Sequence, residues 1–281
     1  MKNKPKFAVI GGDDRLLYAA QFLAEADFDI CTFGMTQTTS FESKNLDEAL
    51  SKADFVLLPI PTSRDGKTIS APNANSPIFI SEILEKTADS AVIFSGMSDM
   101  LRDDRIIDYG KSEDFAVSNA IPTAEGAMLL TMSELHETVS GMNVGVIGFG
   151  KVGTAVARLF HAANANVTVF ARKETALRQA ESLGYRNEKI VTLPEKAKAF
   201  TCLINTVPAL ILDESALCGM RADTLIIELA SAPFGIDFDA AEKRGIRVIR
   251  ASGLPGKYFP KTAGEIIART VLQILNQKNL L

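Results

Sequence analysis

The chain has 281 residues, of which 47% are hydrophobic and 23% charged, and its formal net charge is −4. This composition is typical of a globular protein long enough for two domains, and it provides no basic surface for nucleic acid. No apolar run approaches the length that spans a bilayer, and residues 1–6 lead into an apolar segment without a signal-peptide core, so we expect a cytoplasmic protein.

The few cysteines and histidines argue against several kinds of site. Cys31, Cys202 and Cys218 are odd in number and unrelated in spacing, which predicts reduced thiols and neither a disulfide framework nor a metal site. The two histidines, His136 and His161, lie before the last third of the chain. A 2-hydroxyacid dehydrogenase supplies its acid/base histidine from that last third, so lactate-type chemistry is disfavoured.

The first half of the chain alternates apolar runs with helical patterns. We expect strands at 7–10, 29–33, 54–58, 91–95 and 115–117, and helices from the turn at 11–16 to residue 26, at 81–86 and at 99–109. The turn at 11–16 lacks a third glycine and carries Asp13 and Asp14 where a phosphate would lie, so no second nucleotide site is expected. Residues 59–77 predict a long loop at the carboxyl end of a strand, of the kind that is often functional or mobile.

The second half repeats the alternation with greater regularity. Helical spacing predicts a bridging helix over 122–140 with Thr123 as its N-cap, and a terminal helix over 263–275. Between them we expect strands at 144–147, 167–170, 190–192, 200–205, 224–229 and 246–249, and helices at 151–163, 175–183, 214–220 and 237–244. Six apolar strands between amphipathic helices fit a doubly wound sheet of order 3-2-1-4-5-6.

The predicted fold is therefore two doubly wound parallel-sheet α/β domains with a cleft between them. We expect a flavodoxin-like substrate domain made of residues 1–120 and about 263–281, a bridging helix at 121–140, and a Rossmann dinucleotide-binding domain at 141–262. The apolar bridging and terminal helices would suit a homo-oligomer interface as readily as an interdomain one.

A glycine motif follows the first strand of the second domain. Gly148, Gly150 and Gly153 have the G-x-G-x-x-G spacing, with a helical pattern directly behind them. These glycines serve a tight turn, the approach of backbone to a pyrophosphate, and close helix–strand packing, and the pyrophosphate lies at the helix N-terminus. Residues of this turn are expected to bind the cofactor: Gly148, Phe149, Gly150, Lys151, Val152 and Gly153.

The end of the next strand indicates which dinucleotide is bound. NAD-binding units carry an acidic residue there for the ribose 2′-OH, whereas this chain has Ala171, Arg172 and Lys173. A guanidinium pairs with a 2′-phosphate and stacks on adenine, so NADP is preferred. Glu174 is interpreted as an N-terminal helix acid. Further along, Thr206, Val207 and Pro208 follow the fourth strand, where the nicotinamide ribose rests against backbone in such folds.

Several longer segments resemble the dipicolinate synthase A-subunit family of spore-forming bacteria. They are Ile-Phe-Ser-Gly (93–96), Asn-Ala-Ile-Pro-Thr-Ala-Glu-Gly (119–126), Gly-Phe-Gly-Lys-Val-Gly (148–153), Ile-Asn-Thr-Val-Pro (204–208), Glu-Leu-Ala-Ser-Ala-Pro-Phe-Gly-Ile-Asp-Phe (228–238) and Gly-Leu-Pro-Gly-Lys (253–257) with Pro-Lys-Thr-Ala-Gly (260–264). The resemblance extends from the first strand to the last helix. Phe234 stands where a glycine is expected in the family, so that turn is expected to differ.

The resemblance implies an NADP-dependent oxidoreductase of the diaminopimelate/lysine branch. Its reaction would convert a dihydrodipicolinate-type ring to dipicolinate (pyridine-2,6-dicarboxylate), the calcium chelator of the spore core. The resemblance also implies expression in the mother cell during sporulation and a flavoprotein-like B-subunit of dipicolinate synthase as partner.

A dicarboxylate substrate requires cations or N–H and O–H donors at both ends. Substrate-binding candidates are Arg64, Lys67, Ser98, Thr123 and Thr262, and catalytic candidates are Glu125 as base or orienter, Lys257 and Ser95. Because aromaticity drives the oxidation, a strong acid/base pair is not required.

Two other interpretations remain open. One is a reductase like shikimate dehydrogenase or methylene-tetrahydrofolate dehydrogenase, although the Lys-Asp pair of shikimate enzymes has its nearest counterpart only in Lys67 and Asp99. The other is a non-catalytic protein that binds NADP as a scaffold while a flavoprotein partner performs the redox step.

Overall fold

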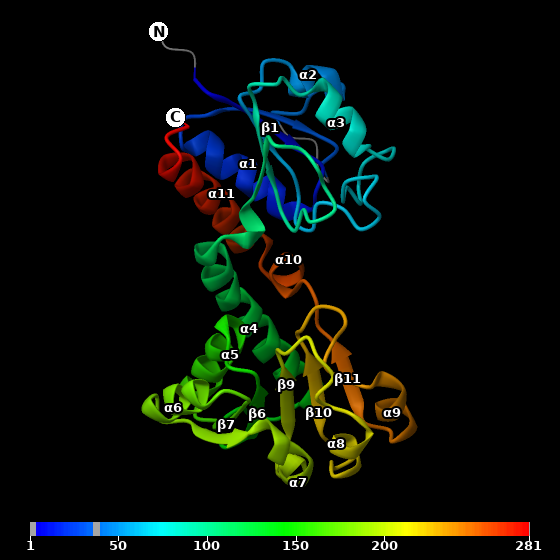
Figure 1. Ribbon diagram of the computed structural model, residues 1–281, viewed down its shortest axis with the longest axis vertical. Helices are drawn as coiled ribbons and strands as arrows, with labels where there is room; N and C mark the ends of the chain where they lie inside the picture. The colour runs from blue at the N-terminus through cyan, green and yellow to red at the C-terminus, as the bar shows by residue number, and fades with distance from the viewer. Residues whose placement is uncertain (1–3, 36–39, 281) are drawn as a thin grey trace. The chain divides into compact units, whose positions relative to one another are not determined.

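The computed structural model describes residues 4–35 and 40–280. The chain divides into two compact units (Figure 1). Unit 1 contains both ends of the chain, Met1–Asn119 and Pro255–Leu281, and unit 2 is the continuous segment Ala120–Leu254. Each unit has one parallel sheet with helices against it, which confirms the prediction of two doubly wound α/β domains.

Unit 1 has five parallel strands in the order β2-β1-β3-β4-β5. The strands are β1 Lys6–Ile10, β2 Asp29–Phe33, β3 Phe55–Leu57, β4 Val92–Ser95 and β5 Ile106–Asp108. The helices are α1 Asp14–Glu25, α2 Leu46–Leu50, α3 Ile80–Lys86, the short 3-10 helix η1 Tyr109–Lys111, α10 Leu254–Tyr258 and α11 Pro260–Gln277. Because β2 and β3 lie on opposite sides of β1, the strand order reverses there. Doubly wound sheets bind ligands at the carboxyl ends of the strands at this position.

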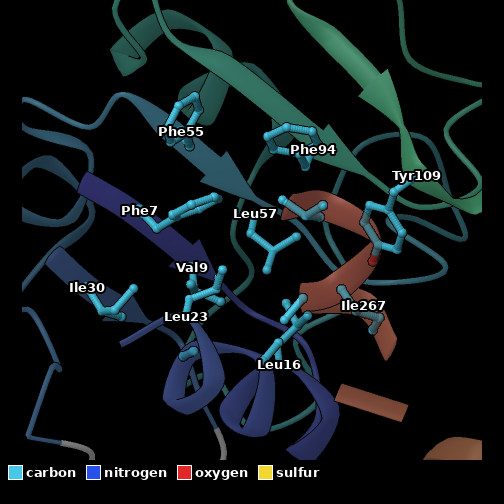
Figure 2. Close-up of a cluster of buried hydrophobic side chains, with 14 of the residues drawn as sticks. Phe7, Val9, Leu16, Leu23, Ile30, Phe55, Leu57, Phe94, Tyr109 and Ile267 are labelled. Atoms are coloured by element: carbon cyan, nitrogen blue, oxygen red, sulfur yellow. The ribbon is translucent and has the colours of Figure 1, made fainter. Parts of the chain in front are cut away.

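One face of this sheet is covered by α1 and α11. Figure 2 shows Leu16 and Leu23 of α1 and Ile267 of α11 facing the side chains of the central strands, among them Phe7 and Phe55. The rings of Phe7 and Phe55 lie 4.9 Å apart between centroids. Burying a side chain of this size stabilises a fold by roughly 1.5–3 kcal/mol. The last helix of the chain is therefore part of the core that surrounds the first strand.

Unit 2 has six parallel strands in the order β11-β10-β9-β6-β7-β8, which is the predicted 3-2-1-4-5-6 order. The strands are β6 Asn143–Ile147, β7 Asn166–Ala171, β8 Arg186–Lys189, β9 Cys202–Asn205, β10 Leu225–Glu228 and β11 Arg247–Arg250. The helices are α5 Lys151–Ala162, α6 Glu174–Ser182, α7 Leu193–Lys196, α8 Glu214–Cys218 and α9 Phe238–Lys243, with 3-10 turns at Ile190–Thr192 and Ala197–Ala199. The strand order reverses between β6 and β9.

Helix α4 differs from its prediction. It is one helix, Glu113–Leu135, with Pro122 in its interior. The expected strand at 115–117 is therefore wrong, and so is the expected N-cap role of Thr123, which lies inside the helix. Proline is common in the first turn of a helix, so the sequence favoured a start at Pro122. The side chain of Pro122 is buried.

Two further elements differ from their predictions. The segment 99–109 is not a helix: it contains β5 and leads into η1. Arg105 donates to the carbonyls of Leu84 and Thr87 and to the carboxylate of Asp103, and these contacts hold the segment extended. The expected strand at 190–192 is a 3-10 turn, and the edge strand β8 precedes it at Arg186–Lys189.

None of the helices in the described part of the chain combines the length and the apolar character needed to cross a membrane.

Candidate functional site

The glycine turn between β6 and α5 has the geometry that a dinucleotide requires. Gly148 has a positive φ of 93°, and a Cβ there would lie 2.5 Å from Thr206 Oγ1. A Cβ on Gly153 would lie 2.2 Å from the carbonyl oxygen of Gly148, so α5 and β6 approach each other as only glycine permits. A Cβ on Gly150, in contrast, would meet no atom within 4 Å. The turn is closed on the protein side and open where a pyrophosphate would lie.

The start of α5 is not capped by a side chain. Gly150 is its N-cap and has no side chain with which to accept from the first turn. The first amides of such a helix carry partial positive charge and favour anions. Lys151 and Val152 follow in this first turn, and the side chain of Lys151 is exposed. The predicted pyrophosphate-binding residues are thus gathered at one helix N-terminus.

The loop after β9 is attached to this turn by Thr206. The backbone amide and the hydroxyl of Thr206 both donate to the carbonyl oxygen of Ile147, at 2.9 and 2.8 Å. Val207 also faces the turn, because a Cβ on Gly148 would lie 2.8 Å from its Cγ2 atom. The structure therefore brings together Gly148, Thr206 and Val207, which the sequence predicted as cofactor-binding residues of separate segments.

The end of β7 presents two cations. Arg172 and Lys173 are exposed, and neither side chain has a partner among the described residues. The neighbouring Glu174 is paired with Lys189, with 2.8 Å between Nζ and Oε1. The hydrogen bond from Lys189 lowers the pKa of Glu174. Glu174 is thus occupied by its salt bridge with Lys189, so the charges available to a ligand at this strand end are those of the two cations.

A buried carboxylate that the sequence analysis did not single out organises the carboxyl ends of β9 and β10. Glu228 is 1% exposed and accepts from Asn205 Nδ2, from the amide of Ala230 and from the amide of Gly235, at 2.8–3.0 Å. Asn205 in turn accepts from the amide of Val207. Desolvation raises the pKa of Glu228, and the three hydrogen bonds oppose that shift. The sequence signal that could have identified Glu228 is a charged residue in an otherwise apolar strand, because a buried charge requires partners.

Unit 1 contains a cavity of about 480 Å³. Its lining residues come from the turn after β1 and from the loop after β3: Gly12, Asp13, Arg15, Pro59, Ile60, Pro61, Arg64, Asp65, Thr68, Ile69, Ser70, Ala71 and Pro72. These segments lie at the carboxyl ends of the strands where the order of the sheet reverses. Of the predicted substrate-binding residues, Arg64 lines this cavity and Lys67 does not, although both are exposed.

The predicted serines near β4 are internal. Ser95 is fully buried, and its hydroxyl lies 2.6 Å from Thr62 Oγ1. Ser98 is also buried, and its amide and hydroxyl both donate to the carboxylate of Asp108. These bonds connect the loop after β3 to the end of β4, and the loop after β4 to the end of β5. The structure therefore supports an architectural role for Ser95 and Ser98 and does not support catalysis by Ser95 or substrate binding by Ser98.

The other predicted site residues are distributed over both units. Lys257 is exposed in α10 of unit 1, with its Nζ 4.8 Å from the centroid of the Tyr258 ring, and Thr262 is exposed in the first turn of α11. In unit 2, Glu125 is exposed on α4 and lines a groove of about 300 Å³ together with Arg158 of α5. Thr123 is half-buried two residues earlier in the same helix. The chain is mostly helical from residue 254 onward, because α10 covers Leu254–Tyr258 and α11 begins at Pro260, before the predicted start of the terminal helix at 263.

Two family models match the chain. Residues 6–106 match the N-terminal domain of the dipicolinate synthase A-subunit, and residues 123–236 match the NAD-binding domain of the D-isomer specific 2-hydroxyacid dehydrogenases. The second match supports a nicotinamide dinucleotide cofactor for unit 2 and an oxidoreductase-type protein.

Similar proteins cover nearly the whole chain. The dipicolinate synthase A-subunit of Bacillus subtilis (strain 168) is 35% identical over 283 residues, which is 96% of this chain and 95% of that protein. The crystal structure of the dipicolinate synthase A-subunit from Bacillus halodurans superposes with a TM-score of 0.86 at 32% identity, covering 96% of this chain and 97% of that one. The crystal structure of the Bacillus subtilis protein superposes with a TM-score of 0.85 at 33% identity, covering 99% and 97%. This chain belongs to the dipicolinate synthase A-subunit family.

Proposed function

We propose that this protein is an NADP-dependent dehydrogenase subunit that oxidises a dihydrodipicolinate-type ring to dipicolinate during sporulation. The preference for NADP is supported by the positive charge at the carboxyl end of β7. Arg172 and Lys173 have no partner there among the described residues, and Glu174 is paired with Lys189. Membership of the dipicolinate synthase A-subunit family supports the choice of substrate.

The residues of unit 2 would hold the cofactor in an extended pose. The pyrophosphate would lie against Gly150 and the first turn of α5, and Arg172 would pair with the 2′-phosphate. Thr206, Val207 and Pro208 would contact the nicotinamide ribose. The 2-hydroxyacid dehydrogenase domain match is to an NAD-binding domain, so the preference for NADP depends on the two cations after β7.

The proposed oxidation does not require a strong acid/base pair of side chains. The dihydro substrate would lose a hydride from one ring carbon and a proton from a second ring position, which gives the aromatic dicarboxylate; bound NADP would supply the hydride acceptor. Because the ring gains aromaticity, water or one carboxylate suffices as proton acceptor. Glu125 and Lys257 remain the proposed base and substrate-orienting cation, since both are exposed and neither is held by a salt bridge within the described residues.

The test is formation of NADPH by the purified chain supplied with dihydrodipicolinate. We expect absorbance at the NADPH wavelength to rise with NADP and to rise much less with NAD at equal concentration. No absorbance change with either coenzyme, in the presence and absence of a flavoprotein partner, would refute the proposal.

A scaffold role is the second candidate. It is favoured by the absence of a close acid/base pair at the glycine turn within the described segments, and by the name of the similar Bacillus subtilis protein, which identifies it as one component of a multi-subunit synthase. In that case a flavoprotein-like B-subunit would carry out the redox step. NADPH formation that appears only when the partner is added, with NADP bound by this chain alone, would select the scaffold role.

A further inference from the structure

We propose that the cavity of unit 1 binds a carboxylate group of a small organic acid through the guanidinium groups of Arg64 and Arg15. This inference deepens the proposed function, because it identifies where one end of a dicarboxylate substrate would be held. Arg15 was not among the residues that the sequence indicated.

The position of the cavity is the first argument. It lies at the carboxyl ends of β1 and β3, between which the strand order of unit 1 reverses, and about 480 Å³ is within the usual range for small-molecule sites. Its walls include Pro59, Ile69 and Pro72. Apolar walls with a few polar groups are suited to a flat ring that carries charged substituents.

The two acidic residues in the lining are both held by hydrogen bonds within unit 1. Asp13 accepts from Nε and Nη2 of Arg15, each at 2.8 Å, and its pKa is lowered: desolvation acts against the shift, and the bonds from Arg15 outweigh it. Asp65 accepts from the amides of Lys67 and Thr68 and from the hydroxyls of Thr68 and Ser63. These bonds also lower the pKa of Asp65. The Arg15 guanidinium therefore compensates the charge of Asp13, whereas the donors to Asp65 are uncharged and this carboxylate keeps its negative charge.

The two guanidinium groups keep uncommitted donors. Arg64 has no partner within residues 4–35 and 40–280. Arg15 is held in place by Asp13 and by the carbonyl of Ile60, which is 2.8 Å from Nη2, while its Nη1 has no partner in the same ranges. Gly256 of α10 packs against Arg15, because a Cβ there would lie 2.9 Å from Nε. One fixed and one free guanidinium at the same cavity favour a carboxylate.

The test is calorimetric binding of dipicolinate to the purified full chain, without turnover. We compare the wild type with Arg64→Met and with the control Arg102→Met, which removes an exposed arginine of unit 1 outside the cavity lining. We expect Arg64→Met to weaken dipicolinate binding by about 10-fold or more, because a charge-assisted bond is lost. Arg102→Met should leave this affinity within about two-fold of wild type, because Arg102 does not line the cavity and loses no bond to the ligand. NADP affinity should be unchanged in both variants.

Arg15→Lys is the second variant, because it keeps the charge and removes the planar fork. We expect it to weaken dipicolinate binding while the thermal midpoint shows that the chain is folded. Inorganic phosphate should compete weakly, and picolinate, with one carboxylate, should bind through Arg64 as well. Phosphate that binds as tightly as dipicolinate would overturn the assignment to a carboxylate.

The outcomes separate this inference from the proposed function. NADPH formation together with dipicolinate binding that is indifferent to Arg64 would overturn the carboxylate site and leave the proposed function intact. Arg64-dependent binding of dipicolinate by a chain that forms no NADPH would support the site and contradict the proposed function.

Discussion

Glu228 and Asn205 form a buried pair in which both carboxylate oxygens lie 2.9 Å from the same amide nitrogen. Each residue also binds the backbone of the loop that follows its strand: Asn205 binds Val207, and Glu228 binds Ala230 and Gly235. The pair therefore connects the loops after β9 and β10. Because Thr206 joins the first of these loops to the end of β6, the pair also stabilises one wall of the glycine turn.

Replacing Glu228 by Gln should destabilise the protein. A glutamine offers one acceptor oxygen to three donors and adds an amide that faces the amide of Asn205, so buried donors lose their partners. Such losses cost about 1–3 kcal/mol of unfolding free energy. Chemical denaturation should show the decrease, and Glu214→Gln, on the exposed start of α8, is the control that should leave the stability unchanged.

The pH dependence of stability tests the same carboxylate. Since burial raises the pKa of Glu228 above its unfolded value, the folded state binds more protons, and stability falls as pH rises from the unfolded pKa through the raised one. The Gln variant does not titrate, so this part of the slope should disappear. If the Gln variant showed the same dependence of stability on pH as the wild type, the pKa of Glu228 would not be raised in the folded state.

Gly150→Ala and Gly153→Ala should separate cofactor binding from folding. A methyl group at position 150 meets no protein atom, so this variant should keep the thermal midpoint of the wild type and lose affinity for NADP. A methyl group at position 153 would collide with the backbone of Gly148, so this variant should also unfold at lower temperature. Calorimetry and thermal unfolding measure the two effects. Equal midpoints for both variants would contradict the packing of α5 against β6.

Arg172→Ser should convert the coenzyme preference. We expect the KM for NADP to rise by about 10-fold or more, as for the loss of one charge-assisted hydrogen bond, with little change for NAD. Arg178→Ser is the matched control, because Arg178 is an exposed arginine of the following helix α6. An equal rise in KM for NADP and for NAD would show that Arg172 contacts a part of the coenzyme that is common to both.

The thiols should differ in reactivity. Cys202 is buried in β9, where burial raises its pKa to about 12, whereas Cys218 at the end of α8 is exposed. A thiolate is the reactive form, so a disulfide reagent should modify Cys218 in the folded protein and Cys202 only after unfolding. Mass spectrometry of the labelled peptides identifies the sites. Labelling of Cys202 in native buffer would show that β9 opens readily.

The sequence predicted those parts of the fold in which local pattern and burial agree. The strand at 29–33 and the glycine turn are examples, because apolar alternation and glycine spacing are local signals. Strand β8 was misplaced because its residues are polar, and only pairing with β7 defines it. The extended segment around Arg105 was not predicted for the same reason. The carbonyls that bind Arg105 belong to Leu84 of α3 and to Thr87 directly after this helix, which lie far from Arg105 in the sequence.

The candidate site was predicted less completely than the fold. The turn after β1 was expected not to bind a nucleotide phosphate, because it lacks a third glycine and carries two adjacent acids. In the structure Asp13 forms a salt bridge with Arg15, and the guanidinium of Arg15 lines the cavity. Ser95 was predicted as a catalytic residue, but its hydroxyl is buried and lies 2.6 Å from Thr62 Oγ1 inside the protein. Both outcomes depend on side-chain direction, which residue order alone does not determine.

The packing of α11 against β1 has a consequence for synthesis on the ribosome. Unit 2 is continuous, so all of its strands have been synthesised once Leu254 has been translated. The hydrophobic layer around Phe7 and Leu16, in contrast, lacks Ile267 and Val271 until after the whole of unit 2 has been translated. The half of the protein that is made first is therefore completed last, and its nascent apolar surface is the one most in need of chaperone protection.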